Sequence, residues 1–182
     1  MSKAKIPVSW VRVLFEYESD TGRLLWAVDA GRWGRIPAGT RAGSEHTDQD
    51  GYRSRYVTIE GKLYKATHLI WAWMTGQWPK RTVDHKNLDG LDDRWENLRE
   101  ADDSQQKQNN RRRKDSKTGF KCVTYYNDPR YRDGKCYRWQ VVVNGKRIKS
   151  STRFETAKEA YEAYCARLPD FHGQFANDGG TS

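Results

Sequence analysis

Residues 83–110 read VDHKNLDGLDDRWENLREADDSQQKQNN, and the fold expected for the first part of the chain follows from this stretch. The short segment TVDH is β-prone, a polar loop follows it, and ENLRE is again extended. The next segment, DDSQQKQNNRRR, is typical of a helix that Asp103 or Ser104 caps at its start. The sequence therefore predicts a strand, a long loop, a second strand and a helix, in that order.

Carboxylates are concentrated in this stretch although the chain as a whole is basic. Residues 84–103 hold eight carboxylates and three basic side chains, whereas all 182 residues sum to a net charge of +9. A bare acidic patch would repel DNA, but a divalent cation held by hard oxygen ligands reverses the local sign and can bind a phosphate. The adjacent imidazole of His85 could accept a proton from an attacking water. Together these groups make hydrolysis of a phosphodiester chemically reasonable.

The stretch resembles the HNH, or ββα-metal, endonuclease motif of phage and intron-encoded enzymes, and the resemblance covers residues 64–110. It implies that Asp84 is a metal ligand, that His85 is the general base, and that Asn97 is the central asparagine that braces the loop and orients the histidine. The metal that it implies is Mg²⁺, for which Mn²⁺ would substitute.

One position departs from the family pattern. Relatives usually present asparagine or histidine as a second metal ligand nine residues after the central asparagine, where this chain has Gln106. An amide oxygen can bind a hard cation, but the extra methylene of glutamine displaces it, and catalysis is sensitive to such displacements. We take Gln106 as the second ligand; Asn109 or Asn110 could replace it through a shift of the helix, or the site could be impaired.

The residues before this motif are expected to form a small α/β scaffold. VSWVRVLFEY (8–17) has helical spacing that includes Phe15, and an irregular stretch is expected up to Gly51. YRSRYVTIEGKLYKAT (52–67) alternates around a turn at Glu60–Gly61, and HLIWAWMTG (68–76) is typical of an apolar helix that Gly76 ends.

The last third of the chain has the pattern of a three-stranded antiparallel sheet with one covering helix. FKCVTYY, YRWQVVV and GKRIKSSTRF are strand-like, and TAKEAYEAYCARL begins with the capping-box pair Thr156 and Glu159. GFKCVTYY, RFETAKEAYEAY and HGQFAN resemble the APETALA-two, or ethylene-response-factor, DNA-binding domain, which also occurs attached to phage HNH nucleases. In that family the sheet enters the major groove of DNA. The arginine and tryptophan pattern of its strands is only partly kept here.

Basic residues are expected to contact DNA in two ways. If Trp139, Val141 and Val143 face the helix, alternation turns the neighbouring side chains outward, where they could read base edges, while the basic linker grips phosphates. The alternative is a solvated face with scattered basic residues. The candidate DNA-binding residues are Arg111, Arg112, Arg113, Lys114, Lys117, Lys121, Arg138, Gln140, Arg147 and Lys149.

The predicted fold class is α+β. The predicted domains are a scaffold and HNH nuclease domain at 1–110, with its ββα core at about 81–112, a basic linker at 111–118, an APETALA-two-like domain at 119–177 and a tail at 178–182.

The predicted function is metal-dependent cleavage of double-stranded DNA, of the phage homing type and directed to its site by the C-terminal domain. A monomer would nick, and a homodimer could cut both strands. We expect no membrane association, no small-molecule cofactor, and a cytoplasmic location, in the host if the chain is phage-encoded. The alternatives are a catalytically impaired, sequence-specific DNA-binding protein and, less consistent with the motif, a nonspecific RNA-binding protein.

Overall fold

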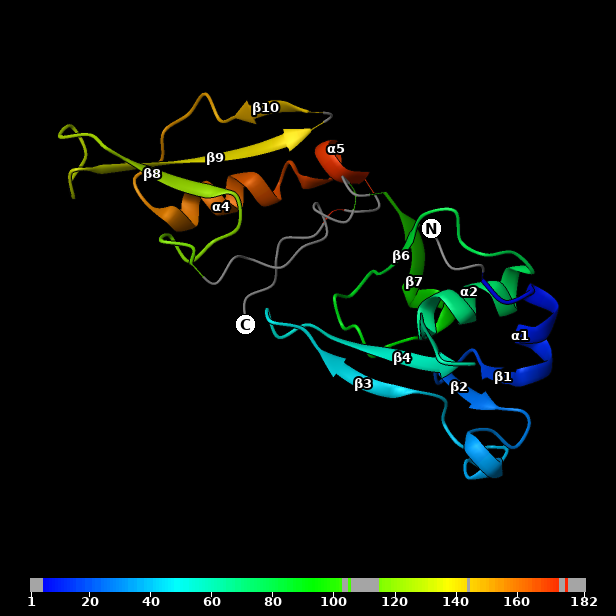
Figure 1. The fold of residues 1–182 in the computed structure, drawn as a ribbon. Helices are drawn as coiled ribbons and strands as arrows, with labels where there is room; N and C mark the ends of the chain where they lie inside the picture. The colour runs from blue at the N-terminus through cyan, green and yellow to red at the C-terminus, as the bar shows by residue number, and fades with distance from the viewer. Residues whose placement is uncertain (1–4, 103–104, 106–114, 144, 174–175, 177–182) are drawn as a thin grey trace. The chain divides into compact units, whose positions relative to one another are not determined.

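The computed structural model of the chain describes residues 5–102, 105, 115–143, 145–173 and 176. Contacts divide the chain into two units, Met1–Asp102 (unit 1) and Asp103–Ser182 (unit 2). In the described residues, four α-helices accompany small antiparallel sheets, which confirms the predicted α+β class (Figure 1). None of the helices within these ranges has the length and apolar character needed to cross a membrane.

Unit 1 begins with helix α1 (Val8–Leu14), strand β1 (Phe15–Glu18) and strand β2 (Arg23–Trp26). The prediction that the helix includes Phe15 is wrong, because Phe15 is already extended and pairs with Trp26. Its ring is 1% exposed and lies 4.5 Å from the Trp26 ring. Burial against a strand partner therefore overrides the helical spacing at this residue.

A three-stranded sheet of order β3-β4-β5 follows. The predicted hairpin is confirmed by β4 (Arg53–Ile59) and β5 (Lys62–Lys65), whose turn residues Glu60 and Gly61 both have positive φ. The prediction of irregular structure up to Gly51 is wrong at β3 (Ser44–Thr47), which pairs with β4. All four β3 side chains are exposed, so this edge strand depends on backbone pairing and has no burial pattern to detect.

Helix α2 (Ala66–Thr75) ends at Gly76 as predicted, since Gly76 adopts the left-handed conformation. Leu69 and Ile70 of α2 are fully buried in the unit 1 core. Large rings complete this core and keep their polar atoms paired: the indole nitrogen of Trp73 donates to the Phe15 carbonyl at 2.9 Å. Packing and hydrogen bonds of α2 therefore hold the N-terminal elements against the segment that follows this helix.

Strand β6 (Thr82–His85) and strand β7 (Leu98–Ala101) form an antiparallel pair, joined by a loop that contains the short helix η2 (Trp95–Asn97). Both predicted strands are confirmed. The helix predicted from Asp103 onward falls almost entirely outside the described residues, so the ββα arrangement stays a prediction.

Unit 2 contains the predicted three-stranded antiparallel sheet of order β10-β9-β8. Its strands are β8 (Val123–Asn127), β9 (Lys135–Val143) and β10 (Lys146–Lys149), and helices α4 (Ala157–Cys165) and α5 (Leu168–His172) follow. Helix α4 contacts β8 and β9, and Figure 1 shows it lying along the sheet. Both hydrogen bonds of the capping box between Thr156 and Glu159 are present, which confirms that prediction.

Candidate functional site

The site is built at the end of the β6–β7 pair. Along β6 the burial alternates, so that Val83 and His85 are buried while Asp84 lies on the opposite face, as strand geometry requires. His85 is 4% exposed and pairs across the strands with Leu98, and Asp84 pairs with Arg99. The two adjacent candidate residues therefore have different surroundings.

Both ring nitrogens of His85 have hydrogen-bond partners. Nε2 lies 2.9 Å from Oδ1 of Asp93, which is 2% exposed, and Nδ1 lies 3.0 Å from the hydroxyl of Tyr52. An ionised carboxylate can only accept a hydrogen bond, which assigns the ring proton to Nε2 and leaves Nδ1 as the acceptor of the Tyr52 hydroxyl. Tyr52, His85 and Asp93 thus form a continuous chain of polar groups with one basic nitrogen.

The β1–β2 hairpin contacts the backbone of Asp93 and holds this residue in place. The Tyr17 hydroxyl donates to the Asp93 carbonyl at 2.8 Å, and Gly22 packs so closely that a Cβ there would lie 2.6 Å from the Asp93 carbonyl carbon. Burial, followed by the negative charge of Asp93, raises the pKa of the Tyr17 phenol, so Tyr17 remains a donor at neutral pH. The carboxylate that holds His85 is therefore positioned by a hairpin about seventy residues earlier in the chain.

Gly90 brings the polar loop against the start of β4. A Cβ on Gly90 would overlap the carbonyl oxygen of Arg53 and would lie 2.6 Å from Cζ of Tyr52. The absence of a side chain at Gly90 therefore lets the loop touch the tyrosine that contacts His85. This glycine is required for close approach, since its φ is not positive.

Asn97 braces the loop between the two strands. Its Oδ1 accepts from the Asn87 amide at 3.0 Å, and its Nδ2 donates to the Asp92 carbonyl at 2.7 Å. Arg94 donates two hydrogen bonds to the Asp92 carboxylate and, with Asn87, lowers the pKa of Asp92 to about 2. These bonds of Asn97 lie within the loop, whereas the hydrogen bonds to the His85 ring come from Tyr52 and Asp93.

The candidate metal ligand Asp84 is paired with Arg99. Arg99 donates from Nε and Nη2 to Asp84 Oδ2, each at 3.2 Å, so both bonds fall on one carboxylate oxygen. A carboxylate is the type of donor that a hard cation prefers. Among the residues that the structure describes, no three or more histidine, cysteine, aspartate or glutamate side chains are grouped to hold a metal. The second candidate ligand, Gln106, lies outside those residues.

The candidate DNA-binding residues of unit 2 follow the strand register. Across the β9–β10 pair, Gln140 lies opposite Lys149 and Val142 opposite Arg147, so these four share one face. Trp139 and Val141 are buried in the core on the other face, and Val143 packs against that core half-buried. Arg147, Lys149 and Lys117 are exposed, Lys121, Arg138 and Gln140 are half-buried, and Arg111, Arg112, Arg113 and Lys114 lie outside the described part of the chain.

No sequence pattern identifies Tyr52 and Asp93 as residues of the site. Asp93 is one of many carboxylates in its stretch, and its complete burial is the property that separates it from them. Tyr52 lies 33 residues before His85 with no local pattern to connect the two. The glycine in LDGLDD is the one sequence signal of the close approach that brings them together.

His68, on α2, predicts a pH dependence of stability. Burial, then the charges of Lys65 and Lys5, lower the pKa of His68 to about 4, and its Nε2 is buried without a hydrogen-bond partner. Since the unfolded histidine takes up a proton near pH 6.5, stability should fall as the pH drops from about 6.5 to 4. We expect a loss of about 1–2 kcal/mol between pH 7 and pH 5 from this group.

Urea unfolding at both pH values measures this effect through tryptophan fluorescence, because every tryptophan except Trp139 lies in unit 1. The variant His68→Gln, which cannot titrate, should lose less stability over the same interval. An equal loss in both proteins would contradict the assignment.

In a comparison with protein families, the family described as HNH endonuclease matches residues 64–111. This segment includes α2, β6, the polar loop and β7. Comparisons with curated proteins and with solved structures give no significant match. The family match supports an HNH nuclease domain, a hydrolase that acts on DNA, in the segment that contains His85, Asp84 and Asn97.

Proposed function

We propose that this chain is a metal-dependent HNH endonuclease that hydrolyses phosphodiester bonds in double-stranded DNA. The observation that carries the proposal is the polar chain Tyr52–His85–Asp93, buried within a segment that matches HNH endonucleases. A buried imidazole held by a carboxylate on one nitrogen keeps its other nitrogen as a base, which is the arrangement that general-base catalysis needs.

In the proposed reaction, Asp93 holds the His85 ring in the tautomer whose Nδ1 is unprotonated. The Tyr52 hydroxyl transfers its proton to Nδ1 while it accepts a proton from the attacking water. The resulting hydroxide forms the new bond to phosphorus as the bond to the 3′ oxygen breaks, and that oxygen takes a proton from solvent. The products are 5′-phosphate and 3′-hydroxyl ends, which the family resemblance also implies.

Asp84 and Gln106 are the residues proposed to hold the divalent cation, Mg²⁺ with Mn²⁺ as a substitute. Both offer oxygen donors, which suit these ions. A bound cation would stabilise negative charge on the phosphate and on the leaving oxygen. Arg99, which holds one Asp84 oxygen, fixes the direction of that carboxylate.

Unit 2 is proposed to direct the nuclease to its DNA site as an APETALA-two-like domain. The exposed side chains of Arg147 and Lys149 lie on one face with Gln140, and these residue types bind phosphates and base edges. The basic segment at residues 111–118, which precedes the sheet of this unit in the chain, would add phosphate contacts. A phage homing enzyme of this kind would nick as a monomer and would need two copies to cut both strands.

Replacing Asp93 with asparagine tests its role as a positioning residue. Asparagine keeps the size of the side chain, but its amide can present N–H to His85 and permits the other tautomer. We expect the rate of nicking to fall by at least about 10- to 100-fold, the range for partners that orient metal-bound histidines through their second ring nitrogen. DNA binding should stay unchanged, so the loss should appear in kcat and not in KM.

The matched control is Asp89→Asn, an exposed carboxylate of the same loop. Equal losses in the two variants, or a fall in DNA affinity that accounts for the loss in Asp93→Asn, would contradict the positioning role. The relay is tested separately by Tyr52→Phe, which removes the hydroxyl alone. Nicking at the wild-type rate in that variant would show that water reaches Nδ1 directly.

The proposed function is tested with supercoiled plasmid, purified full-length chain and Mg²⁺ or Mn²⁺. We expect open-circular product with either metal and none with EDTA. Sequencing of the nicked ends should show whether the cut positions are specific. Persistent supercoils with both metals at high enzyme concentration would refute the nuclease activity.

The second candidate is a sequence-specific DNA-binding protein without cleavage activity. Specific observations favour it as an alternative: both His85 nitrogens are already hydrogen-bonded, and Asp84 is held by Arg99. A protein of this kind should give a footprint on particular DNA sequences that EDTA does not change. It should not nick plasmid with either metal. The plasmid experiment therefore separates the two candidates.

A further inference from the structure

Hydrogen bonds close the base of a short loop between β2 and β3. None of the loop residues belongs to the polar chain of Tyr52, His85 and Asp93. Ala30 and Ile36 exchange two backbone hydrogen bonds, at 2.7 and 2.9 Å, which close the base of the loop. The Asp29 carboxylate accepts a hydrogen bond from the Ala38 amide at 2.9 Å, which links the residues that flank the Ala30–Ile36 pair. Figure 1 shows this loop, with the short helix η1 (Arg32–Gly34), projecting beyond β2 on the side of unit 1 away from α2.

Trp33 stands at the tip of this loop, with 82% of its surface exposed. It also adopts the left-handed conformation, with φ of 64°, which costs free energy in a residue with a side chain. The exposed indole regains none of this energy through burial in unit 1. Strained backbone positions of this kind are concentrated at functional sites, which makes this loop a candidate for one.

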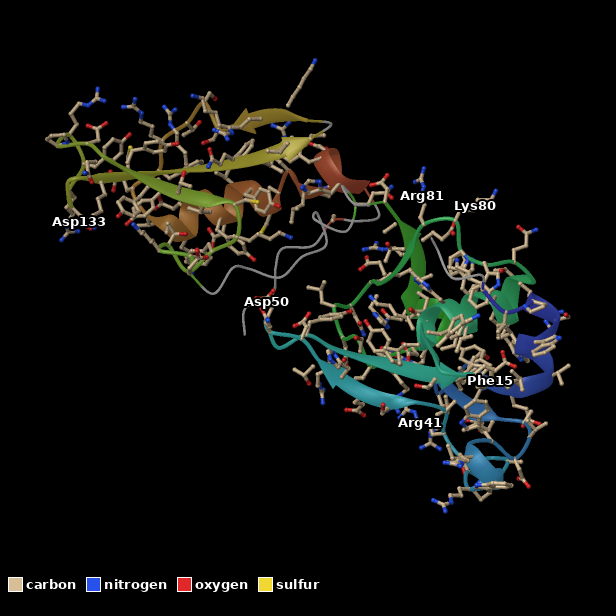
Figure 2. All side chains as sticks on the ribbon, in the orientation of Figure 1. Phe15, Arg41, Asp50, Lys80, Arg81 and Asp133 are labelled. Carbon is tan, nitrogen blue, oxygen red and sulfur yellow. The ribbon has the colours of Figure 1, made fainter. Side chains whose placement is uncertain are left out.

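The surroundings of Trp33 are positively charged. Residues 30–43 contain Arg32, Arg35 and Arg41 and no acidic residue, and all three arginines are exposed. The Arg32 guanidinium lies 5.9 Å from the centre of the Trp33 ring. Figure 2 labels Arg41 beside the base of the loop. The nearby acid, Asp29, is engaged with the loop backbone.

A flat aromatic ring flanked by arginines complements a partner that carries both phosphates and flat rings. Nucleic acid has both: its phosphates bind arginine, and its bases stack on aromatic side chains. A protein partner would match the indole but would need an acidic surface for the arginines. The charge of the loop therefore favours nucleic acid.

We propose that this loop is a DNA-contacting element of unit 1, in which Trp33 packs on a base or sugar and Arg32 and Arg35 bind phosphates. The inference rests on the proposed function only in that the nucleic acid is the DNA that the enzyme would cut. It adds a second DNA contact that is separate in the chain from the basic face of unit 2.

The test measures binding of the full-length chain to a labelled 60-base-pair duplex of mixed sequence, by fluorescence anisotropy in EDTA. Trp33→Ala should weaken binding by about 5-fold, the low end of the range for loss of one base-stacking contact, because paired bases expose less of their faces than unpaired ones; Trp33→Phe should retain most of the affinity. The double variant Arg32→Gln/Arg35→Gln should make the plot of log Kd against log salt shallower by about two.

The matched control is Trp10→Ala, a half-exposed tryptophan on α1 that carries no such group of arginines, and it should bind like the wild type. Equal binding by Trp33→Ala and Trp10→Ala would overturn the inference. So would a wild-type dimer, detected by sedimentation without DNA, that Trp33→Ala dissociates, because the ring would then contact a second copy.

The two proposals fail in different ways. Weak binding by Trp33→Ala in a protein that never nicks plasmid would refute the nuclease and keep the DNA contact. Metal-dependent nicking together with wild-type binding by Trp33→Ala would keep the nuclease and refute the contact.

Discussion

Replacing His85 with alanine should lower the rate of plasmid nicking by about 10²- to 10⁴-fold, the range expected for loss of a general base. The substitution removes the only imidazole of the polar chain with Tyr52 and Asp93 and leaves no group to accept the proton that Tyr52 transfers. The change should appear in kcat with little change in DNA affinity, because the ring is 4% exposed and contributes little surface for binding.

Two controls accompany this measurement. His46→Ala removes an exposed histidine on β3 and should nick at the wild-type rate. Since His85→Ala leaves the Asp93 carboxylate buried without this partner, the variant His85→Gln, with an amide of similar reach, shows whether a loss of stability explains the result. Nicking within tenfold of the wild-type rate by folded His85→Ala would contradict the general-base role.

Replacing Gly90 with alanine should destabilise unit 1 by about 2–3 kcal/mol, the cost of overpacking where backbone must move. The added methyl group would overlap the Arg53 carbonyl and press on the Tyr52 ring, so neither a rotamer change nor a flexible side chain can relieve it. For a unit of this size the melting temperature should fall by about 10 °C or more. Nicking should fall too, because Tyr52 must shift from Nδ1 of His85.

Gly61→Ala is the matched control for this substitution. Gly61 has positive φ but open space around the position of a Cβ, so alanine there should cost only the backbone strain, about 1 kcal/mol. Melting curves that show equal shifts for the two variants would contradict the close approach at Gly90. A large shift without loss of nicking would show that the position of Tyr52 does not matter for the reaction.

Together these substitutions show how the site depends on separate parts of unit 1. His85 comes from β6, Tyr52 is the residue before β4, and Asp93 comes from the polar loop that the β1–β2 hairpin supports. The N-terminal scaffold therefore takes part in the site, because it supplies Tyr52 and positions Asp93. A fragment limited to residues 64–111 would lack Tyr17, Gly22 and Tyr52, and with them these supports.

Elements with local signals could be predicted from the amino-acid sequence alone. The Glu60–Gly61 turn, the end of α2 at Gly76, the strands β6 and β7, and the capping box at Thr156 each follow from the conformational preferences of neighbouring residues. The motif around Asp84, His85 and Asn97 could be found for the same reason, since its residues lie within a short segment. Strand β3 could not, because an exposed edge strand has no pattern of burial.

The side chains that contact His85 could be identified only once the chain was folded. Phe15 joins a strand although its spacing is helical, because burial against Trp26 outweighs local preference. Asp93 differs from the carboxylates around it by burial, and Tyr52 reaches His85 from the segment just before β4, where Gly90 allows the loop to approach. Such contacts depend on packing between segments distant in the chain, and a sequence pattern records only interactions between near neighbours.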